Sequence, residues 1–286
     1  MKYHSPENFE DAVAIATQAG GTTRFLAGGT DVLVQLRADI VTPDDLIDLK
    51  NIAGVSDISR GEDGWTIGIS TSGAEMSEHP DLQHEWPGLV EAMDLIGSTQ
   101  IQGRATLVGN LCNASPAADS VPAMIAAGVS VSVVGPDGTR RVAVEDIPTG
   151  PGQTSLGKGE MVSAIHVPPQ VAHAADAYLR FIPRTEMDIA VVGCGVYLQL
   201  DGDVISTARV SLGAVAPTAL LVEDAAAAIV GTKLDDAAME KLAAAASAAC
   251  NPIDDKRGTI KFRTHVAGVL ARRAAKIAYD RARAAK

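Results

Sequence analysis

Residues 23–49 run TRFLAGGTDVLVQLRADIVTPDDLIDL, a pattern that predicts a small β-α-β unit with a glycine turn. Strands are expected over Thr23–Ala27 and Asp45–Leu49, with a helix over Asp31–Ala38 between them. Gly28-Gly29 ends the first strand. Because glycine has no Cβ, backbone N–H groups at this turn can approach a ligand, and the helix start that follows favours an anion such as phosphate. A plain turn between strand and helix is the alternative.

A second glycine-containing segment, residues 100–119, runs QIQGRATLVGNLCNASPAAD. It places Thr106, Gly109 and Asn110 in a turn and puts an acidic residue, Asp119, at the start of another expected helix. A carboxylate in that place can accept hydrogen bonds from ribose hydroxyls. A simple helix cap is the alternative role for Asp119.

Together the two segments resemble the FAD-binding medium subunits of the xanthine dehydrogenase and carbon monoxide dehydrogenase family. The pattern of that family is an Ala-Gly-Gly-x-[Ser/Asp] loop followed by Gln-Ile-Arg-Asn-x-[Ala/Gly]-Thr-x-Gly-Gly-Asn. The resemblance continues through residues 115–123, 152–156, 180–190 and 252–273 and so covers the whole chain. The chain departs from the pattern at Val108, which replaces the first family glycine, and at Gln102-Gly103, which replaces Arg-Asn.

The resemblance implies an α+β fold with two domains. The first would be a two-lobed vanillyl-alcohol-oxidase-like (PCMH-type) FAD-binding domain over residues 1–172, with lobes of about 1–56 and 57–172. The second would be a CO-dehydrogenase-flavoprotein-like domain of antiparallel sheet and helices over residues 173–286.

The residue pattern itself predicts elements of the same kind. Hairpins are expected between Ile58 and Ser70 and between Val129 and Val144, and two long β runs over Ile189–Leu200 and Val204–Val215 precede alanine-rich helices. Pro168-Pro169 and the Ala/His-rich residues after them predict a linker.

The N-terminal segment predicts a helix that is entered through Ser5 and Pro6 and stops at Gly20-Gly21.

The resemblance and the two glycine turns together assign noncovalent FAD to this chain, since no His or Cys lies in an evident flavin-attachment motif. The loops around Ala27–Asp31 and Thr106–Asn110 would hold the pyrophosphate, with Asp119 on the ribose side. The expected FAD-binding residues are Phe25, Leu26, Ala27, Gly28, Gly29, Thr30, Asp31, Val32, Thr106, Leu107, Val108, Gly109, Asn110, Cys112, Ser115, Asp119, Leu156, Arg180 and Ile189. No metal ligand or catalytic residue is expected. Cys112 is interpreted mainly as a small packing residue near the flavin.

Composition narrows the possible partners. The net charge of -11, without a basic run that carries interleaved aromatics, argues against nucleic acid as a partner.

No apolar run is long enough to cross a bilayer and the N-terminus is polar, so a cytoplasmic protein is expected. Three widely spaced cysteines supply neither an iron–sulfur cluster nor a zinc site.

The resemblance therefore implies an oxidoreductase subunit that relays electrons. A large molybdopterin-binding subunit would oxidise the substrate, and a small subunit would pass electrons through [2Fe–2S] clusters to FAD on this chain. FAD would hand them to an external acceptor, with NAD, a quinone, oxygen and a carrier protein all open. The implied assembly is a dimer of heterotrimers. A stand-alone FAD oxidase or dehydrogenase and a flavin-free scaffold are the alternatives.

One further motif competes with this interpretation. Residues 152–158, GQTSLGK, copy most of a phosphate-binding P-loop, but Gly159 stands where a hydroxyl residue would hold magnesium, and a strand is expected next.

Overall fold

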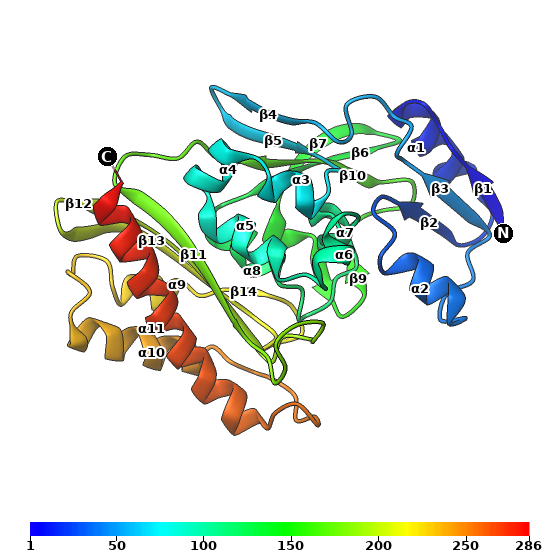
Figure 1. Cartoon of the computed structure of the whole chain (residues 1–286). Coiled ribbons are helices and arrows are strands. Elements are labelled where there is room, and N and C mark those ends of the chain that lie inside the picture. The colour runs from blue at the N-terminus through cyan, green and yellow to red at the C-terminus, as the bar shows by residue number, and fades with distance from the viewer. Residues whose placement is uncertain (286) are drawn as a thin grey trace.

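The computed structural model describes residues 1–285, and its N-terminal lobe is built on a three-stranded parallel sheet of order β1-β3-β2 (Figure 1). The strands are β1 (Lys2–His4), β2 (Thr23–Leu26) and β3 (Asp45–Asp48), joined through α1 (Phe9–Gln18) and α2 (Val32–Arg37). The β-α-β unit predicted for residues 23–49 is therefore present as β2, α2 and β3. Strand β1 is an addition that its three-residue sequence did not indicate.

The first helix starts later than predicted. The side chain of Asn8 accepts the backbone N–H of Asp11 at 2.8 Å and so caps α1, which begins at Phe9. Ser5, the predicted entry residue, instead accepts a hydrogen bond from the Asn51 side chain at 2.8 Å. The prediction that the helix is entered through Ser5 and Pro6 is wrong, because the side chain of Asn8 accepts a backbone N–H of the first turn and so caps the helix three residues later.

The second lobe contains a five-stranded antiparallel sheet of order β4-β5-β10-β6-β7. Its outer pairs are the two predicted hairpins, and β10 joins them in the middle. The strands are β4 (Ile58–Gly61), β5 (Gly64–Gly68), β6 (Ser130–Gly135), β7 (Gly138–Ala143) and β10 (Met161–Val167). Since β10 directly follows the P-loop-like residues 152–158, that stretch leads into a strand, as predicted, and not into a helix.

Helices of the second lobe share one hydrophobic cluster with this sheet. They are α3 (Gly73–Ser77), α4 (Pro80–Glu85), α5 (Pro87–Asp94), α6 (Thr99–Gln102), α7 (Leu107–Cys112) and α8 (Ser120–Ala126). A 3-10 turn, η1 (Val144–Asp146), and the small hairpin of β8 (Pro148–Gly150) and β9 (Gln153–Thr154) complete the lobe.

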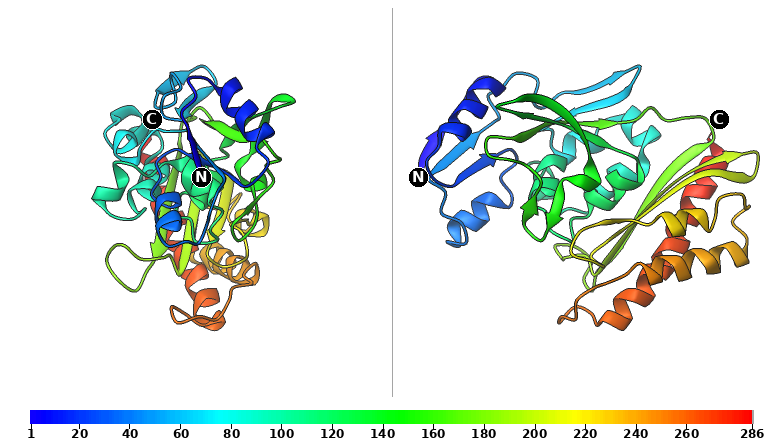
Figure 2. Two further views of the ribbon diagram at one scale, coloured as in Figure 1. Left: turned by 90° about the vertical axis from the view of Figure 1, so that its right-hand side faces the viewer. Right: turned by 180° about the vertical axis from the view of Figure 1, so that it is seen from behind.

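The C-terminal part is an antiparallel sheet of order β11-β12-β13-β14 covered by helices (Figure 2). Its strands are β11 (Ala174–Phe181), β12 (Val192–Asp201), β13 (Val204–Gly213) and β14 (Leu220–Leu221). Its helices are α9 (Glu223–Ala227), α10 (Asp236–Ala248) and the long α11 (Ile260–Ala284). Because β11 already begins at Ala174, the predicted linker is shorter than the Ala/His-rich stretch suggested.

Close backbone packing joins the C-terminal sheet to the second lobe. A Cβ built on Gly195 of β12 would lie 2.5 Å from the carbonyl oxygen of Pro122 in α8, and one on Gly213 of β13 would lie 3.0 Å from the Pro122 ring. Only glycine allows so close an approach, so α8 lies directly against the sheet. Within residues 1–285, no helix has both the length and the apolar character that crossing a bilayer requires.

Candidate cofactor site

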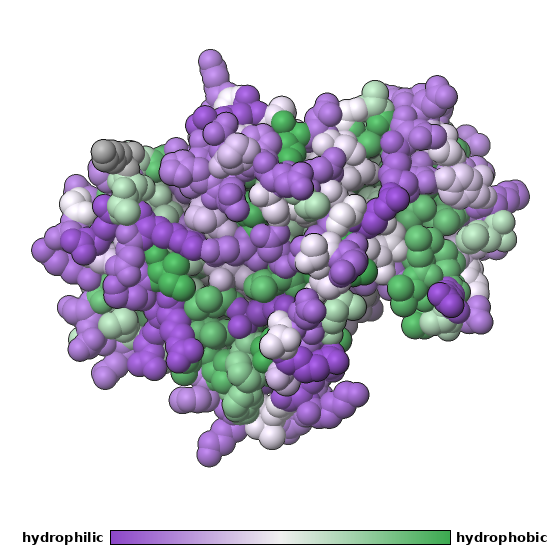
Figure 3. Space-filling model, in the orientation of Figure 1, coloured by the Kyte–Doolittle hydropathy of each residue, from purple (hydrophilic) through white to green (hydrophobic). Residues whose placement is uncertain are grey.

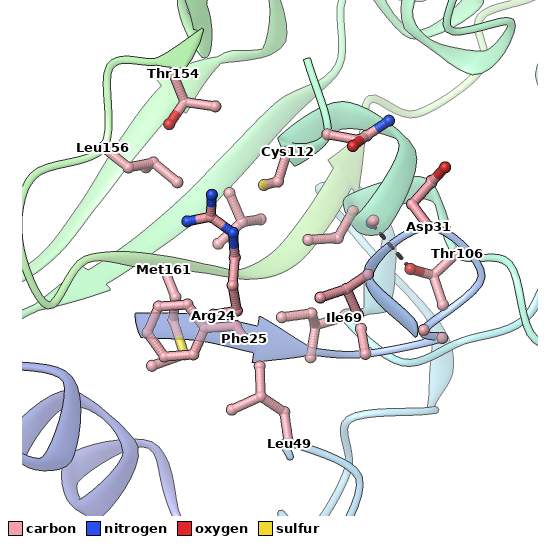
Figure 4. A pocket seen from close by; sticks show the side chains of 18 of the residues that line it. Arg24, Phe25, Asp31, Leu49, Ile69, Thr106, Cys112, Thr154, Leu156 and Met161 are labelled. Carbon is pink, nitrogen blue, oxygen red and sulfur yellow. Dashed lines mark hydrogen bonds between the residues drawn. The ribbon is translucent and has the colours of Figure 1, made fainter. Parts of the chain in front are cut away.

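A cavity of about 710 Å³ lies between the two N-terminal lobes (Figure 4). Its walls come from β2 and the turn after it, from α2, from the start of α7 and from the loop between β9 and β10. This volume falls within the range of roughly 300–1,000 Å³ that is usual for cofactor and ligand pockets.

The two predicted glycine turns meet at this cavity. A Cβ built on Gly28 would stand 1.8 Å from the carbonyl oxygen of Arg104 and 3.3 Å from Cγ2 of Thr106. The side chain of Thr106 caps α7 by accepting the backbone N–H of Gly109 at 2.9 Å. Residues separated by some 80 positions in the sequence thus form one continuous wall.

Backbone donors without partners lie along this wall. Across residues 1–285, none of the backbone N–H groups of residues 28–32, or of Leu107 and Val108, has a hydrogen-bond acceptor. Backbone N–H groups in folded proteins are nearly always paired, with water or a ligand where no protein acceptor is at hand. Clustered donors at the starts of two helices suit the oxygens of a phosphate group, so the wall fits the pyrophosphate of a dinucleotide.

The charged side chains of the cavity differ in how they are engaged. Glu160 lines the cavity and accepts two hydrogen bonds from Arg140, each of 2.9 Å, which lower its pKa. Asp31 has no ion-pair partner within the described chain, and burial raises the pKa of its carboxyl group. Arg24 and Lys158 also line the cavity.

Asp119 lies behind the cavity wall and does not cap α8 with its side chain. Its carboxylate accepts hydrogen bonds from the Tyr178 hydroxyl at 2.8 Å and from Arg180 Nη1 at 2.7 Å, both on β11. Next to it, the side chain of Ser120 donates to Oδ1 of Asn110 at 2.7 Å. Asn110 lines the cavity, so this chain of contacts connects the cavity to the C-terminal sheet.

Most of the predicted FAD-binding residues line the cavity. These are Phe25, Ala27, Gly28, Gly29, Thr30, Asp31, Val32, Thr106, Val108, Gly109, Asn110, Cys112 and Leu156. The others do not, because the side chains of Leu26 and Leu107 pack in the core, Ile189 is exposed in the loop between β11 and β12, and Ser115, Asp119 and Arg180 lie outside the lining.

Several cavity residues were not predicted from sequence. Arg24 precedes the glycine turn, and Thr154, Lys158 and Met161 come from the segment around β9 and β10. Gln35 of α2 donates to the side chain of Asn113 at 3.2 Å, which links the two helix ends at the cavity. The only signal that could have identified them is nearness in sequence to a glycine turn, since their meeting depends on how the two lobes pack.

Cys112 ends α7 beside the cavity, where burial raises the pKa of its thiol to about 12. The thiol is therefore protonated at neutral pH and acts as a small apolar group. Among the described residues, no group of His, Cys, Asp and Glu side chains has an arrangement that could hold a metal ion.

Comparison with known proteins agrees with this architecture. Residues 1–170 match the family described as "FAD binding domain in molybdopterin dehydrogenase", and residues 177–278 match "CO dehydrogenase flavoprotein C-terminal domain". The carbon monoxide dehydrogenase medium chain of Afipia carboxidovorans is 34% identical over 98% of this chain and 97% of its own length. A putative xanthine dehydrogenase FAD-binding subunit of Escherichia coli strain K12 is 30% identical over 95% of this chain and 93% of its own.

A solved structure shows the same fold. The structure described as reconstituted CO dehydrogenase from Oligotropha carboxidovorans has a chain of 33% identity that superposes with a TM-score of 0.94, covering 98% of both chains. The fold and the site thus define an FAD-binding protein of the molybdopterin dehydrogenase class. The chain belongs to the family of FAD-binding medium subunits of molybdenum hydroxylases, and the predicted α+β fold class is confirmed.

Proposed function

We propose that this chain binds one FAD noncovalently and relays electrons from the [2Fe–2S] clusters of a partner subunit to an external acceptor. The observation that carries the proposal is the wall made by the Gly28 and Thr106 turns, whose free backbone N–H groups face a cavity of cofactor size. Bound FAD supplies a ring that exchanges electrons singly or in pairs. The polypeptide binds, orients and shields that ring.

The chain's own residues divide this work. The N–H groups of the two turns would hold the pyrophosphate, while Phe25, Leu156 and Met161 would provide apolar contact for the rest of the nucleotide. We assign Asp119 to the ribose side of FAD and Arg180 and Ile189 to its neighbourhood.

The partners follow from the relatives, whose names describe a "medium chain" and an FAD-binding subunit. We propose a large molybdopterin-binding subunit that oxidises the substrate, a small [2Fe–2S] subunit, and assembly as a dimer of heterotrimers. Exposed apolar side chains on and after α2, namely Leu33, Val34 and Ile40, form a surface of the kind that a partner covers (Figure 3). We place the domain boundary at residues 172 and 173.

Purification of the tagged chain from cells that carry its natural partners tests the proposal. The expected result is a yellow complex with a larger and a smaller chain, in which substrate reduces first the clusters and then the flavin. Acid precipitation should release all the flavin as FAD, at one per chain. A yellow chain that oxidises a substrate without partners would instead support a stand-alone oxidase, and flavin left on the denatured chain would contradict noncovalent binding. Cell fractionation tests the predicted cytoplasmic location.

A further inference from the structure

The C-terminal segment that includes α11 carries a concentration of positive charge that the proposed function does not use. Residues 256–286 contain ten of the chain's 24 basic residues but only one of its 35 acidic residues. Residues 1–255 hold the other 14 basic and 34 acidic residues, so the segment carries +9 and the rest of the chain -20. The field of exposed charges fades within about 8 Å at physiological ionic strength, so distant acidic residues do not cancel this positive surface.

Part of this charge is not balanced inside the chain. Five basic residues of the segment form ion pairs with carboxylates, and these are Arg257, Arg263, Lys276, Arg281 and Arg283. Lys256, Lys261, Arg272 and Arg273 are exposed and have neither an ion pair nor a side-chain hydrogen bond within residues 1–285. Arginine is enriched in protein interfaces, so two adjacent arginines without partners indicate a contact surface.

The cations of α11 form one row along its exposed side. Lys261, Arg272 and Lys276 are separated by 11 and 4 residues, which is close to whole helical turns, so they project in nearly the same direction. Arg273 borders them, and we call these four residues the basic row. From Lys261 to Lys276 the row spans roughly 22 Å at 1.5 Å per residue. A surface of that length fits within a standard protein interface of about 800 Å² per partner.

The helix beside α11 decides which kind of anion suits the basic row. The Ser247 hydroxyl of α10 donates to Thr264 O of α11 at 3.0 Å, and the start of α10 exposes Asp235, Asp236 and Glu240. A flat anionic membrane would meet these carboxylates together with the row, and so would a nucleic acid backbone. A protein surface can instead place acidic side chains against α11 and other groups against α10. The occupant that fits is therefore an acidic protein surface.

The place of α11 in the fold selects among the partners of the proposed complex. The cavity is lined from β2, α2 and α7, and Figures 1 and 2 show α11 on the far side of the C-terminal sheet from these elements. The small [2Fe–2S] subunit passes electrons to the flavin and so must approach the cavity. The large subunit has no such requirement, so the surface of α11 is open to it.

We propose that the basic row of α11, with Arg272 and Arg273 as its unpaired arginines, binds an acidic surface of the large partner subunit. An exposed aromatic pair, Phe181 and Phe262, lies at the start of the same helix with ring centroids 5.5 Å apart and adds apolar contact at one end. This inference rests on the proposed function and adds the place where the large subunit is held. The contact fixes the position of the two chains and takes no part in electron transfer.

The first test identifies the chain that covers the basic row, in the complex purified with its natural partners. A carbodiimide joins a lysine amine directly to a nearby carboxylate, so mass spectrometry of the treated complex should find Lys261 joined to an Asp or Glu of the large subunit. Lys2, which is exposed on β1, is the control and should form no such link. A link from Lys261 to the small subunit or to a second copy of this chain would overturn the choice of partner.

The second test reverses the charge of the row. The double variant Arg272→Glu, Arg273→Glu should leave the complex at lower salt than the parent, with the dissociation constant for the large subunit raised at least about tenfold. The control Lys2→Glu, Arg141→Glu changes the charge by the same amount at exposed residues outside α11 and should behave as the parent does. Flavin content and the urea midpoint should match those of the parent in both variants.

Two further results would overturn the inference. In one, the Arg272→Glu, Arg273→Glu complex keeps the affinity and the salt dependence of the parent. In the other, the complex stays intact while the parent chain binds phosphatidylserine vesicles and the double variant does not, which would make the row a membrane contact. A parent chain that holds no flavin and purifies without partners would instead remove the proposed function.

Discussion

The backbone of Gly28 lies so close to Arg104 that a Cβ at residue 28 would stand 1.8 Å from the Arg104 carbonyl oxygen. The missing side chain therefore makes room for the second glycine turn. The motif alone predicts that the ligand phosphate occupies that space. Gly28 therefore affects ligand binding indirectly, because its missing side chain lets the two turns pack into one wall of the cavity.

Replacing Gly28 with alanine should force the two turns apart. Overpacking against a rigid carbonyl costs roughly 1–3 kcal/mol of folding free energy, and the displaced N–H groups should lose FAD. Flavin content and urea denaturation measure the two effects. Gly103→Ala is the matched control, because its Cβ would meet nothing within 4 Å. Full flavin content in Gly28→Ala would show that the wall tolerates separation.

The buried pair of Asp119 and Arg180 should matter for stability beyond any contact with FAD. Asp119→Ala leaves Arg180, which is only 5% exposed, without its counter-charge, and breaking such a pair costs about 3–5 kcal/mol. The double variant Asp119→Leu, Arg180→Met should recover much of this loss in urea denaturation. Asp280→Ala, which breaks an exposed pair with Lys276, should cost at most about 1 kcal/mol. Equal losses in the two single variants would contradict the importance of burial.

The Asp176 carboxyl group predicts a pH dependence of stability. It is 2% exposed on β11 and accepts the backbone N–H groups of Gly88 and Leu89 at 2.9 and 2.8 Å. Burial raises its pKa from an ordinary 3.8 to about 7, against the opposing effect of these hydrogen bonds. The folded state therefore binds the proton more tightly than the unfolded chain, so this group's contribution to stability is full below pH 4 and is lost as the pH rises towards 7.

Urea midpoints of the parent and Asp176→Asn between pH 4 and 7 measure this contribution. An amide does not titrate, so the stability of the parent should fall relative to that of the variant as the pH rises. Parallel profiles would show that Asp176 keeps a low pKa in the folded protein.

Cys112→Ala should leave electron transfer intact. The thiol is protonated, since burial raises its pKa to about 12, and removing it changes only packing beside the cavity. Flavin reduction after substrate addition, followed in the assembled complex, should proceed as in the parent, with a modest change in flavin affinity. Cys250→Ala, just after the C-terminal end of α10, is the control. Normal cluster reduction without flavin reduction in a fully flavinated Cys112→Ala complex would give the thiol a redox role.

The glycine turn after β2 and the hairpins could be predicted because their signals are local. Glycines interrupt apolar runs there, and alternation marks the strands. Strand β1 is three residues long and owes its pairing to β3, some 43 positions away, so no local pattern identifies it. Likewise, the alanines at the start of β11 lack the alternation typical of a strand, and the burial of Asp176 depends on the N-terminus of α5.

The residues of the site also divide into those that local sequence signals predict and those whose place depends on tertiary packing. The motif predicts residues on the two glycine turns, most of which line the cavity, whereas Arg24 and Lys158 reach the cavity only through the packing of the two lobes. Asp119 shows a further limit of prediction from sequence. A helix cap and a ribose ligand both suited its position in the sequence, but its carboxylate oxygens bond to Tyr178 and Arg180, whose places on β11 could not be foreseen.

The contact of Pro122 with Gly195 and Gly213 has a consequence for how such chains diverge. A side chain at Gly195 would strike the backbone of α8 unless the helix withdrew, and one at Gly213 would strike the Pro122 ring unless residue 122 became smaller. Substitutions at residues 122 and 213 are therefore tied together and should arise as compensating pairs, whereas residue 195 should stay glycine as long as α8 keeps its place. The residues at the interface between α8 and the C-terminal sheet should therefore change slowly in evolution. The exposed loops on either side of this interface should vary more.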